Sequence, residues 1–495
     1  MKIRFREIFP RFTEEVKRLR DLERLIEVRP PITSRRAQLF LLTLLVDAVV
    51  MWLLFENTAL NREAVFMSGI FVLAGLLWVT EALPLFATAI IIIALEIIFL
   101  ANPGKWAGFG FANGSSPDYQ EFLSPLANPI IVLFFGGFLL AQAVLKEGVD
   151  KAMASVILRW FGSKPQMVML GLMTITAVFS MWMSNTATTA MMITLVVPML
   201  YQLPEGDPLR KGLLLCIPFA ANIGGMGTPI ASPPNAVAVS FLRQAGYDIS
   251  FLQWVLIAVP LMVFLLAFAW LLLIKLFPPQ NPQILLMSEQ RSIDRRGWYV
   301  IVVLVTTVLL WLTDRFHGLS TAVVALFPAV AFTATGLITR SDINSLEWHI
   351  LILIMGGIAL GIGMQTTGLD TILVEAIPVQ GQAIMAALVI ATILFSTFIS
   401  NTAAANLLLP IGITYAIQQL GSEISGPGPI QLGVSIALAA SLAMSLPVST
   451  PPNTIAYSKG DLESGDFSRT GIIIGLVSVL LIIFLGNVII SFWLD

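Results

Sequence analysis

Residues 180–192 read SMWMSNTATTAMM, and residues 396–408 read STFISNTAAANLL. Both stretches contain Ser-x-x-x-Ser-Asn-Thr-Ala within long apolar sequence. Small polar side chains in sequence of membrane-spanning length are costly unless they have a function. Because the same cluster occurs twice, we predict one site that is built from two related parts of the chain.

The composition around these clusters is that of a membrane protein. Hydrophobic residues make up 57% of the 495 residues, and charged residues make up only 12%. A soluble protein carries about 25% charged residues. Many apolar stretches reach the ~20 residues that a helix needs to cross a bilayer. We therefore predict an all-α polytopic membrane protein. The single cysteine, Cys216, excludes an internal disulfide.

The apolar stretches predict about eleven membrane-spanning helices and two re-entrant helical hairpins. The expected spans are 38–55, 63–80, 83–100, 128–145, 211–240, 251–277, 298–313, 319–338, 347–367, 430–457 and 470–493. Two further stretches, 165–202 and 381–419, are long enough to cross twice, but Ser-Asn-Thr interrupts each of them midway. We expect each to enter and leave the membrane on the same side.

The positive charges predict the orientation. Of the 28 Lys and Arg residues, this topology leaves only Arg62, Lys105, Arg243 and Arg315 outside. Such a bias places the N-terminus in the cytoplasm and, with eleven crossings, the C-terminus outside the cell membrane. Residues 1–36 alternate charges with Leu, Ile and Val and lack an apolar signal core. We expect no secretory leader there, but an amphipathic helix on the cytoplasmic surface.

Other motifs also occur twice. Gly136-Gly137 and Gly148-x-Asp150, assigned to the fourth span, match Gly356-Gly357 and Gly368-x-Asp370 in the ninth, and the glycine pairs favour close helix packing. Pro233-Pro234-Asn235 matches Pro451-Pro452-Asn453. We therefore divide the chain into an N-terminal segment (1–36), a first helix (37–62), a first repeat (63–277), a cytoplasmic linker (278–297) and a second repeat (298–495). Five crossings per repeat, an odd number, imply that the repeats are inverted, as in secondary transporters.

The hairpin tips and the Pro-rich stretches would expose free backbone groups. Ser, Asn and Thr are good N-cap residues, and a helix N-terminus suits an anion. The carbonyls that end the preceding helix, with Ser hydroxyls and an Asn oxygen, suit Na+. Glycine and proline at 224–229 and 445–452 should unwind the fifth and tenth spans. Two tips facing two breaks would form two cation sites beside one site for a doubly charged small anion.

These motifs, with Trp78-Val-Thr-Glu-Ala-Leu-Pro84, resemble the divalent anion/sodium symporter family over about residues 38–495. This family contains the INDY-type dicarboxylate, citrate and sulfate carriers. The resemblance implies one Na+ site at Ser180, Ser184, Asn185 and the Gly227 carbonyl, and a second at Ser396, Ser400, Asn401 and the Ser445 carbonyl. It implies substrate binding by Asn185, Thr186, Asn401, Thr402, Thr228 and Pro447. It also implies a homodimer in which a transport domain moves as an elevator against a scaffold.

The leading hypothesis is Na+-coupled symport of a C4 dicarboxylate such as succinate, malate or fumarate. A Na+-independent dicarboxylate exchanger, a sulfate or citrate carrier and a passive anion channel remain as alternatives. A membrane-embedded enzyme needs a nucleophile with a base, or clustered His and acidic ligands. The two histidines are scattered, so we do not expect an enzyme. We also expect no nucleic acid partner. Asp47, Glu81 and Glu96 could relay protons, but we favour snorkelling to the membrane surface.

Overall fold

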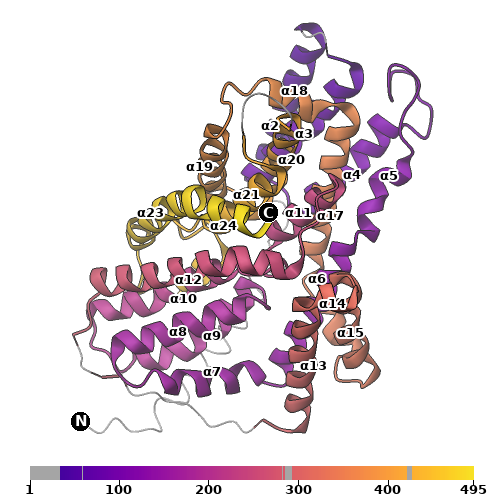
Figure 1. The fold of residues 1–495 in the computed structure, drawn as a ribbon. Helices are drawn as coiled ribbons and strands as arrows, with labels where there is room; N and C mark the ends of the chain where they lie inside the picture. The colour runs from indigo at the N-terminus through magenta and orange to yellow at the C-terminus, as the bar shows by residue number, and fades with distance from the viewer. Residues whose placement is uncertain (1–33, 58–59, 281–282, 285–292, 421–425, 495) are drawn as a thin grey trace.

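The computed structural model describes residues 34–57, 60–280, 283–284, 293–420 and 426–494, and within them the chain consists of helices and loops (Figure 1). Before the linker the elements are α2 (Ser34–Asn57), α3 (Arg62–Thr80), α4 (Leu85–Glu96), the π-helical η1 (Ile97–Ala101), α5 (Tyr119–Leu123), the 3-10 turn η2 (Ser124–Ala127), α6 (Pro129–Lys146), α7 (Val149–Trp160), α8 (Pro165–Ser180), α9 (Asn185–Leu200), α10 (Pro208–Gly224), α11 (Pro233–Gln244) and α12 (Phe251–Leu276).

After the linker, the elements are α13 (Arg295–Leu312), α14 (Asp314–His317), α15 (Thr321–Ala334), α16 (Arg340–Asn344), α17 (Trp348–Thr367), α18 (Leu369–Glu375), α19 (Ala383–Phe398), α20 (Asn401–Gln418), α21 (Pro429–Ser441), α22 (Pro451–Tyr457), α23 (Ser464–Leu480), the π-helical η3 (Leu481–Gly486) and α24 (Asn487–Leu494). Below, "first half" means residues 63–277 and "second half" means residues 298–495.

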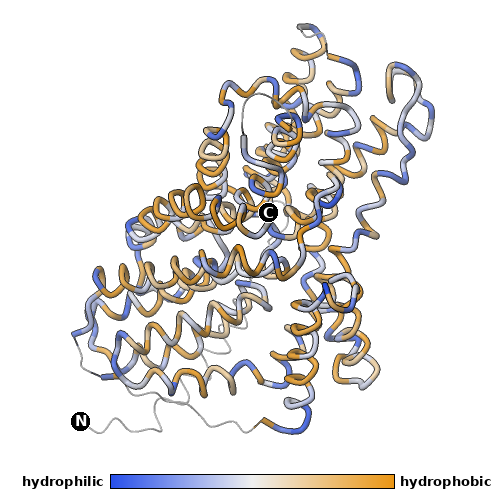
Figure 2. The backbone as a smooth tube through the Cα atoms, viewed as in Figure 1, coloured by the Kyte–Doolittle hydropathy of each residue, from blue (hydrophilic) through white to orange (hydrophobic). Residues whose placement is uncertain are grey.

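Membrane-length helices are present in both halves. In the described residues, seven helices are long and apolar enough to cross a bilayer unbroken: Arg35–Glu56, Arg62–Thr80, Tyr119–Lys146, Phe251–Leu276, Arg295–Leu312, Trp348–Thr367 and Ser464–Trp493. The other expected spans coincide with shorter helices, namely α4 with η1, α10 with α11, α15, and α21 with α22. Figure 2 shows hydrophobic residues along most helices and hydrophilic residues mainly in the loops. The all-helical membrane fold is confirmed, and the number of crossings stays a prediction.

The N-terminal segment and the stretch between the two halves can be compared with the sequence prediction. The amphipathic helix expected at 1–36 lies almost wholly outside the described residues, because α2 begins at Ser34. α13 begins at Arg295, within the stretch 278–297 expected as a linker, and the Asp294 side chain caps it by accepting from Gly297 N (2.8 Å). The domain boundaries stay a prediction. Ile284 N donates to Ser163 O (2.9 Å), so this linker residue lies beside the loop before α8.

The two Gly-x-Asp motifs lie beyond the spans to which the sequence assigned them. α6 ends at Lys146, and Gly148 (φ 67°) precedes the separate helix α7. Likewise α17 ends at Thr367, and Gly368 (φ 73°) precedes α18. Glycine adopts this left-handed conformation without strain. Each motif is therefore a corner that ends a long helix and starts a short one, and the assignment to spans four and nine was wrong.

The two Gly-Gly pairs are sites of close helix packing, as predicted. A Cβ on Gly136 would overlap the Ala325 carbonyl of α15, and a Cβ on Gly356 would overlap Ala89 of α4. The second glycine of each pair faces a different partner. Gly137 approaches Ile230 between α10 and α11, and Gly357 approaches the Asn406 carboxamide of α20. In each pair, the two adjacent glycines therefore face two different neighbouring segments.

The helices around the two Ser-Asn-Thr clusters interleave. In the first half, α8 and α9 pack against α10, and in the second half, α19 and α20 pack against α21. Between the halves, α22 packs against α9 and α10, while α11 packs against α20 and α21. The other helices form two units, with α15 on α6 and α13, and with α17 and α3 on α4, and α17 also packs against α11 and α20. Figure 1 shows α8, α9 and α10 on one side of the molecule and α6, α13 and α15 on the other.

Candidate functional site

Each Ser-Asn-Thr tripeptide starts a helix at the tip of a helix–loop–helix unit. Ser184 (φ −61°, ψ 142°) caps α9, and its hydroxyl accepts a hydrogen bond from Ala187 N (3.3 Å). Ser400 (φ −65°, ψ 143°) caps α20 and accepts from Ala403 N (3.1 Å). The predicted N-caps are confirmed, and the serine provides the cap in both tips.

The two Pro-rich stretches are breaks between helices, as predicted. The first break runs from the end of α10 at Gly224 to Pro233, and the second from the end of α21 at Ser441 to Pro451. Asn235 Nδ2 donates to Gly225 O (3.0 Å) and Thr228 O (2.8 Å). A buried carbonyl without a partner is costly, so this amide stabilises the unwound backbone.

The second break is held in the same way. Asn453 Nδ2 donates to Met444 O (3.0 Å) and Leu446 O (2.9 Å). Asn235 and Asn453 are both fully buried. The sequence showed that the Pro-Pro-Asn motif is duplicated, but it gave no indication that its asparagine binds the carbonyls of its own break.

An oxygen cluster lies where the first tip meets the first break. Ser180 Oγ is 2.5 Å from Asn185 Oδ1 and 2.8 Å from the carbonyl oxygen of Ala221 on α10. A hydroxyl has one proton, so it can satisfy only one of these two acceptors at a time. Ser180 is fully buried. In secondary transporters, carbonyl oxygens at such helix ends and breaks coordinate Na+, so this cluster is a candidate cation site.

The second tip repeats this cluster. Ser396 Oγ is 2.7 Å from Asn401 Oδ1 and 2.8 Å from the carbonyl oxygen of Ala440 on α21, and Ser396 is also fully buried. The structure thus brings together the predicted Ser and Asn of each site. The sequence missed the Ala221 and Ala440 carbonyls, because a backbone carbonyl has no side-chain signature.

A hydroxyl from each break also binds the backbone of its tip. Thr228 Oγ1 donates to Met181 O (2.5 Å), and Ser449 Oγ donates to Thr397 O (2.8 Å). Met181 and Thr397 each directly follow the serine of their oxygen cluster. Thr228, predicted to bind substrate, therefore joins tip and break here. Ser449, which makes the matching contact, was not predicted.

The remaining predicted site residues also lie in the tips and breaks, but they do not contact the two oxygen clusters in the way that the sequence predicted. A Cβ on Gly227 would lie 3.0 Å from Met181 Cγ, so Gly227 faces the first tip, but a Cβ on Gly225 would come closer to the Asn185 amide (2.5 Å). The Ser445 backbone packs against Gly471 of α23, and Pro447 O accepts from Thr454 Oγ1 (2.9 Å). Thr186 is half-buried and Thr402 is buried at the starts of α9 and α20.

The two tips differ in their surroundings. Trp182 of the first tip stacks on Phe251 of α12 and Trp311 of α13, with ring centroids 6.1 and 6.3 Å apart. Phe398, which occupies the same place in the second tip, is 72% exposed. Ser184 Oγ donates a hydrogen bond to Glu347 Oε1 (2.9 Å). Glu347 was not among the residues predicted from the sequence. The first tip is thus packed against second-half residues.

Two other features lie away from the tips. Glu96 on α4 is fully buried, and neither carboxyl oxygen has a hydrogen-bond partner among the described residues. The prediction that Glu96 snorkels to the membrane surface is therefore wrong.

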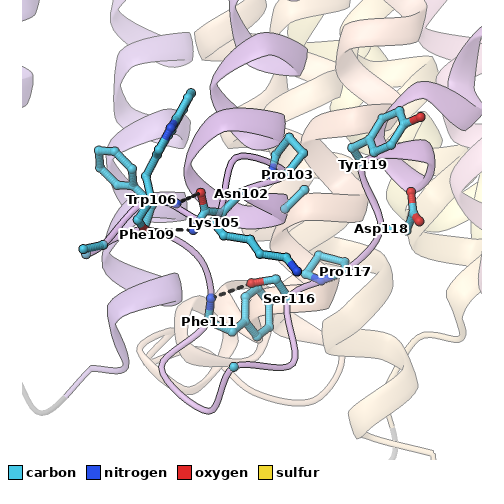
Figure 3. A pocket seen from close by; sticks show the side chains of 14 residues that line it. Asn102, Pro103, Lys105, Trp106, Phe109, Phe111, Ser116, Pro117, Asp118 and Tyr119 are labelled. Carbon is cyan, nitrogen blue, oxygen red and sulfur yellow. Dashed lines mark hydrogen bonds between the residues drawn. The ribbon is translucent and has the colours of Figure 1, made fainter.

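A hollow of about 600 Å³ is lined only by residues 101–119, including Asn102, Lys105 and Asp118. Figure 3 shows two hydrogen bonds in its lining, from Trp106 N to Asn102 Oδ1 and from Phe111 N to Ser116 Oγ. No residue of either tip or break lines it.

Comparison with known families decides the class of protein. The sequence family described as the sodium:sulfate symporter transmembrane region matches residues 35–494. The chain belongs to this family. Sodium:sulfate symporter relatives are secondary transporters of anions, not enzymes, and the chain is accordingly a multi-pass membrane protein. The resemblance drawn from the two tips and two breaks is confirmed.

Curated relatives within the sodium:sulfate symporter family differ in substrate. The inorganic phosphate transporter PHO87 of Saccharomyces cerevisiae is 31% identical over 431 residues, which are 83% of this chain and 45% of that protein. The sodium-dependent dicarboxylate transporter SdcS of Staphylococcus aureus is 29% identical over 489 residues, 90% of this chain and 88% of SdcS. The chain spans about half the length of the yeast relatives that it matches.

A solved structure supports the fold assignment. The YdaH transporter of Alcanivorax borkumensis superposes with a TM-score of 0.54 at 14% sequence identity, covering 75% of this chain and 87% of YdaH. At that identity the similarity concerns the fold alone.

Proposed function

We propose that this protein is a secondary active transporter that couples Na+ entry to uptake of a C4 dicarboxylate such as succinate, malate or fumarate. The observation that carries the proposal is the duplicated oxygen cluster, with Ser180, Asn185 and Ala221 in one half and Ser396, Asn401 and Ala440 in the other. SdcS, a sodium-dependent dicarboxylate transporter, is similar over nearly the whole chain.

Each cluster would hold one Na+. In the first site, Ser180, Asn185 and the Ala221 carbonyl would bind the ion, with Ser184 and the Gly227 carbonyl completing its shell. In the second, Ser396, Asn401 and the Ala440 carbonyl would do so, with Ser400 and the Ser445 carbonyl. Hydroxyl, amide and carbonyl oxygens are hard donors that suit such a cation.

The anion would lie between the two tips. Asn185 and Thr186 begin α9, and Asn401 and Thr402 begin α20. Free N–H groups at helix N-termini attract anions. Asn185 Oδ1 faces Ser180, so the same carboxamide can give its oxygen to Na+ and its N–H groups to the anion. Such sharing predicts positive linkage between cation and anion binding.

The proposal includes the membrane architecture expected from the sequence. The halves would be inverted repeats, with re-entrant hairpins at 165–202 and 381–419, an N-terminus in the cytoplasm and a C-terminus outside the cell membrane. The interleaved helices α8 to α11 and α19 to α22 would form the transport domain of an elevator, and α3, α4, α6, α13, α15 and α17 the scaffold of a homodimer. The packing of α8 to α11 with α19 to α22, and of α15 on α6 and α17 on α4, supports this division, with α17 contacting α11 and α20 across it.

A second candidate substrate is inorganic phosphate, because PHO87 is 31% identical to this chain. Divalent phosphate offers oxygens to the same N–H groups as a carboxylate. Sulfate or citrate transport and Na+-independent exchange by the same fold are further alternatives.

Uptake into proteoliposomes tests the proposal. Labelled succinate is offered with and without an inward Na+ gradient, and unlabelled phosphate, sulfate and citrate are offered as competitors. We expect Na+ to accelerate uptake and succinate to compete best. Equal uptake in both conditions would leave an exchanger, and selective competition by phosphate would reassign the substrate.

Two variants test the site. Asn185→Ala and Asn401→Ala should each abolish uptake, because each removes a ligand of Na+ and of the anion. Asn406→Ala is the matched control. Asn406 also lies on α20, and its buried carboxamide has no hydrogen-bond partner among the described residues. Normal uptake by either tip variant would refute the site.

A further inference from the structure

We infer that the hollow between η1 and α5 is a binding site for a zwitterionic phospholipid head group of the phosphatidylethanolamine type. The hollow is lined by residues 101–119 and has a volume of about 600 Å³. Binding sites for small molecules in proteins have volumes of this order. The inference does not depend on the proposed function, because no residue of the tips or breaks lines this hollow.

The loop that forms the hollow has no counterpart of equal length in the second half. From Asn102 to Asp118 the chain contains no helix. The matching connection in the second half, between α15 and α17, runs only from Thr335 to Glu347 and contains α16. Long loops without secondary structure are usually either functional or disordered. The contacts of this loop show that it has a defined conformation, which favours a function.

The loop is fixed by contacts within itself and to α3. The Asn102 side chain accepts a hydrogen bond from Trp106 N (2.9 Å) and donates one to Trp106 O (3.0 Å). Arg62 Nε of α3 donates to Gly110 O (3.2 Å). The rings of Trp106 and Phe109 pack edge to face, with their centroids 6.2 Å apart. A hollow that exists before its ligand arrives loses little conformational freedom on binding.

Lys105 has a backbone conformation that lysine rarely adopts. Its φ is 52°, in the left-handed region, and its N–H donates to Asn102 O (2.9 Å), which closes a tight turn. Such strained residues are found at ligand-binding positions, where the surrounding structure holds them in place. Figure 3 shows the Lys105 side chain extended from this turn toward Ser116 and Pro117. The turn therefore directs an ammonium group over the hollow.

The charges of the lining match a zwitterion. Lys105 is the only cation among the lining residues, and Asp118 is the only carboxylate. Both are exposed, and neither belongs to an ion pair within the described part of the chain. Asp118 Oδ1 caps α5 by accepting from Gln120 N (2.8 Å), which leaves Oδ2 for a ligand. Lys105 can thus bind a phosphate group while Asp118 binds an ammonium group.

The position of the hollow favours a lipid as the source of this head group. The hollow lies where the apolar α4 and η1 end and where the membrane-length helix Tyr119–Lys146 begins. Trp106 is 53% exposed and Tyr119 is 42% exposed. Exposed Trp and Tyr residues concentrate at the membrane–water interface. Ile98 on η1 and Leu123 on α5 are also exposed, so acyl chains would find apolar surface on the two elements that flank the hollow.

Three lipids separate the contributions of the two charges. Phosphatidylethanolamine carries a phosphate and an ammonium group with N–H donors. Phosphatidylglycerol lacks the ammonium group, and phosphatidylcholine lacks the N–H donors. We therefore expect phosphatidylethanolamine to reach half-saturation at an about fivefold lower concentration than the other two, because each of these loses one charged contact in a partly exposed site.

Thermal unfolding of the purified full chain in detergent and potassium chloride, titrated with the dioleoyl form of each lipid, tests the inference. A ligand that binds only the folded state raises the unfolding midpoint. Lys105→Gln should weaken binding of all three lipids about fivefold, because all three carry the phosphate, and Lys105→Arg should stay close to wild type. Asp118→Asn keeps an acceptor for Gln120 N and should remove only the preference for phosphatidylethanolamine over phosphatidylglycerol.

Arg315→Gln is the matched control. Arg315 is an exposed cation on α14 that does not line the hollow, so this variant should match wild type with every lipid. Equal half-saturation by phosphatidylethanolamine and phosphatidylglycerol in wild type, or a preference that Asp118→Asn retains, overturns the inference. O-phosphoethanolamine is titrated separately, and stabilisation by this soluble head group at the concentrations at which the lipid acts overturns the assignment to a lipid. None of these results alters the proposed transport function, which the uptake assay tests separately.

Discussion

Asn222 on α10 donates a hydrogen bond to the Asn453 side-chain oxygen on α22, with the two atoms 3.3 Å apart. The same Asn222 amide reaches Thr450 Oγ1 (3.1 Å), and in the matching place Ser441 of the second half contacts Ser232 of the first (3.4 Å). Each break is therefore bound to the end of the helix that precedes the other break, as well as to its own asparagine.

Asn453→Ala should destabilise the protein strongly. The substitution leaves the Met444 and Leu446 carbonyls and the Asn222 amide without this partner, all of them buried or nearly so. A buried polar group that loses its partner costs about 1–3 kcal/mol, so we expect a loss of about 3 kcal/mol. Thermal unfolding in detergent measures it. Asn222→Ala should lower the free energy of unfolding by less than Asn453→Ala does. Equal unfolding midpoints for Asn453→Ala and wild type would contradict the proposal that Asn453 stabilises the second break.

Ser180→Ala and Ser396→Ala should each weaken Na+ binding. Either change removes one oxygen from a three-oxygen cluster, and we expect half-saturating Na+ to rise by roughly ten- to a hundredfold from the loss of one charge–dipole contact of about 1.5–3 kcal/mol. Na+-dependent thermal stabilisation measures this. Ser435→Ala is the control, because this buried hydroxyl on α21 has no hydrogen-bond partner among the described residues. Unchanged Na+ dependence in both tip variants would contradict the cluster assignment.

Adjacent glycines on α6 should respond differently to the same substitution. Gly136→Ala places a methyl group against the Ala325 carbonyl of α15, so the two helices must move apart. Gly137→Ala places its Cβ 3.5 Å from Ile230 Cδ1, an ordinary contact. Overpacking costs about 1–3 kcal/mol, so only Gly136→Ala should lower the unfolding midpoint. Equal unfolding midpoints for Gly136→Ala and Gly137→Ala would mean that α6 and α15 can move apart without losing stability.

The Lys146–Asp342 ion pair should make stability depend on pH. Burial raises the pKa of Asp342, but hydrogen bonds from Lys146 and Thr339 outweigh it and lower that pKa to about 2. A carboxyl whose pKa is lower in the folded state stabilises the fold above its unfolded pKa of 3.8, and this stabilisation is lost as pH falls toward 2. Asp342→Asn should therefore be less stable than wild type by about 1 kcal/mol at neutral pH.

The same variant supplies the control for that prediction. Unfolding midpoints of wild type and Asp342→Asn are compared from pH 6 downward. The difference should stay constant to about pH 4 and shrink below it. A difference that persists at low pH would show that the asparagine perturbs the corner at 337–348 for a reason other than charge.

Much of this fold could be predicted from local sequence. Helix positions followed from apolar length, and the breaks followed from Ser-Asn-Thr and Pro-Pro-Asn, because these signals act within a few residues. The short helices α7 and α18 were missed, although Gly148 and Gly368 mark their starts. The Ala221 and Ala440 carbonyls and the Glu347–Ser184 contact could not be predicted, since backbone ligands and contacts across 163 residues leave no local pattern.

The exchange of polar contacts between the two halves bears on how such a protein could originate. Asn222 of the first half needs Thr450 and Asn453 of the second, and α11 and α22 each lie against helices of the opposite half. An ancestor that encoded one half alone would have left these groups unsatisfied within the bilayer. Such a half could satisfy them by pairing with another copy of itself, and fusion of the two copies would then allow the tips to differ, as Trp182 and Phe398 do.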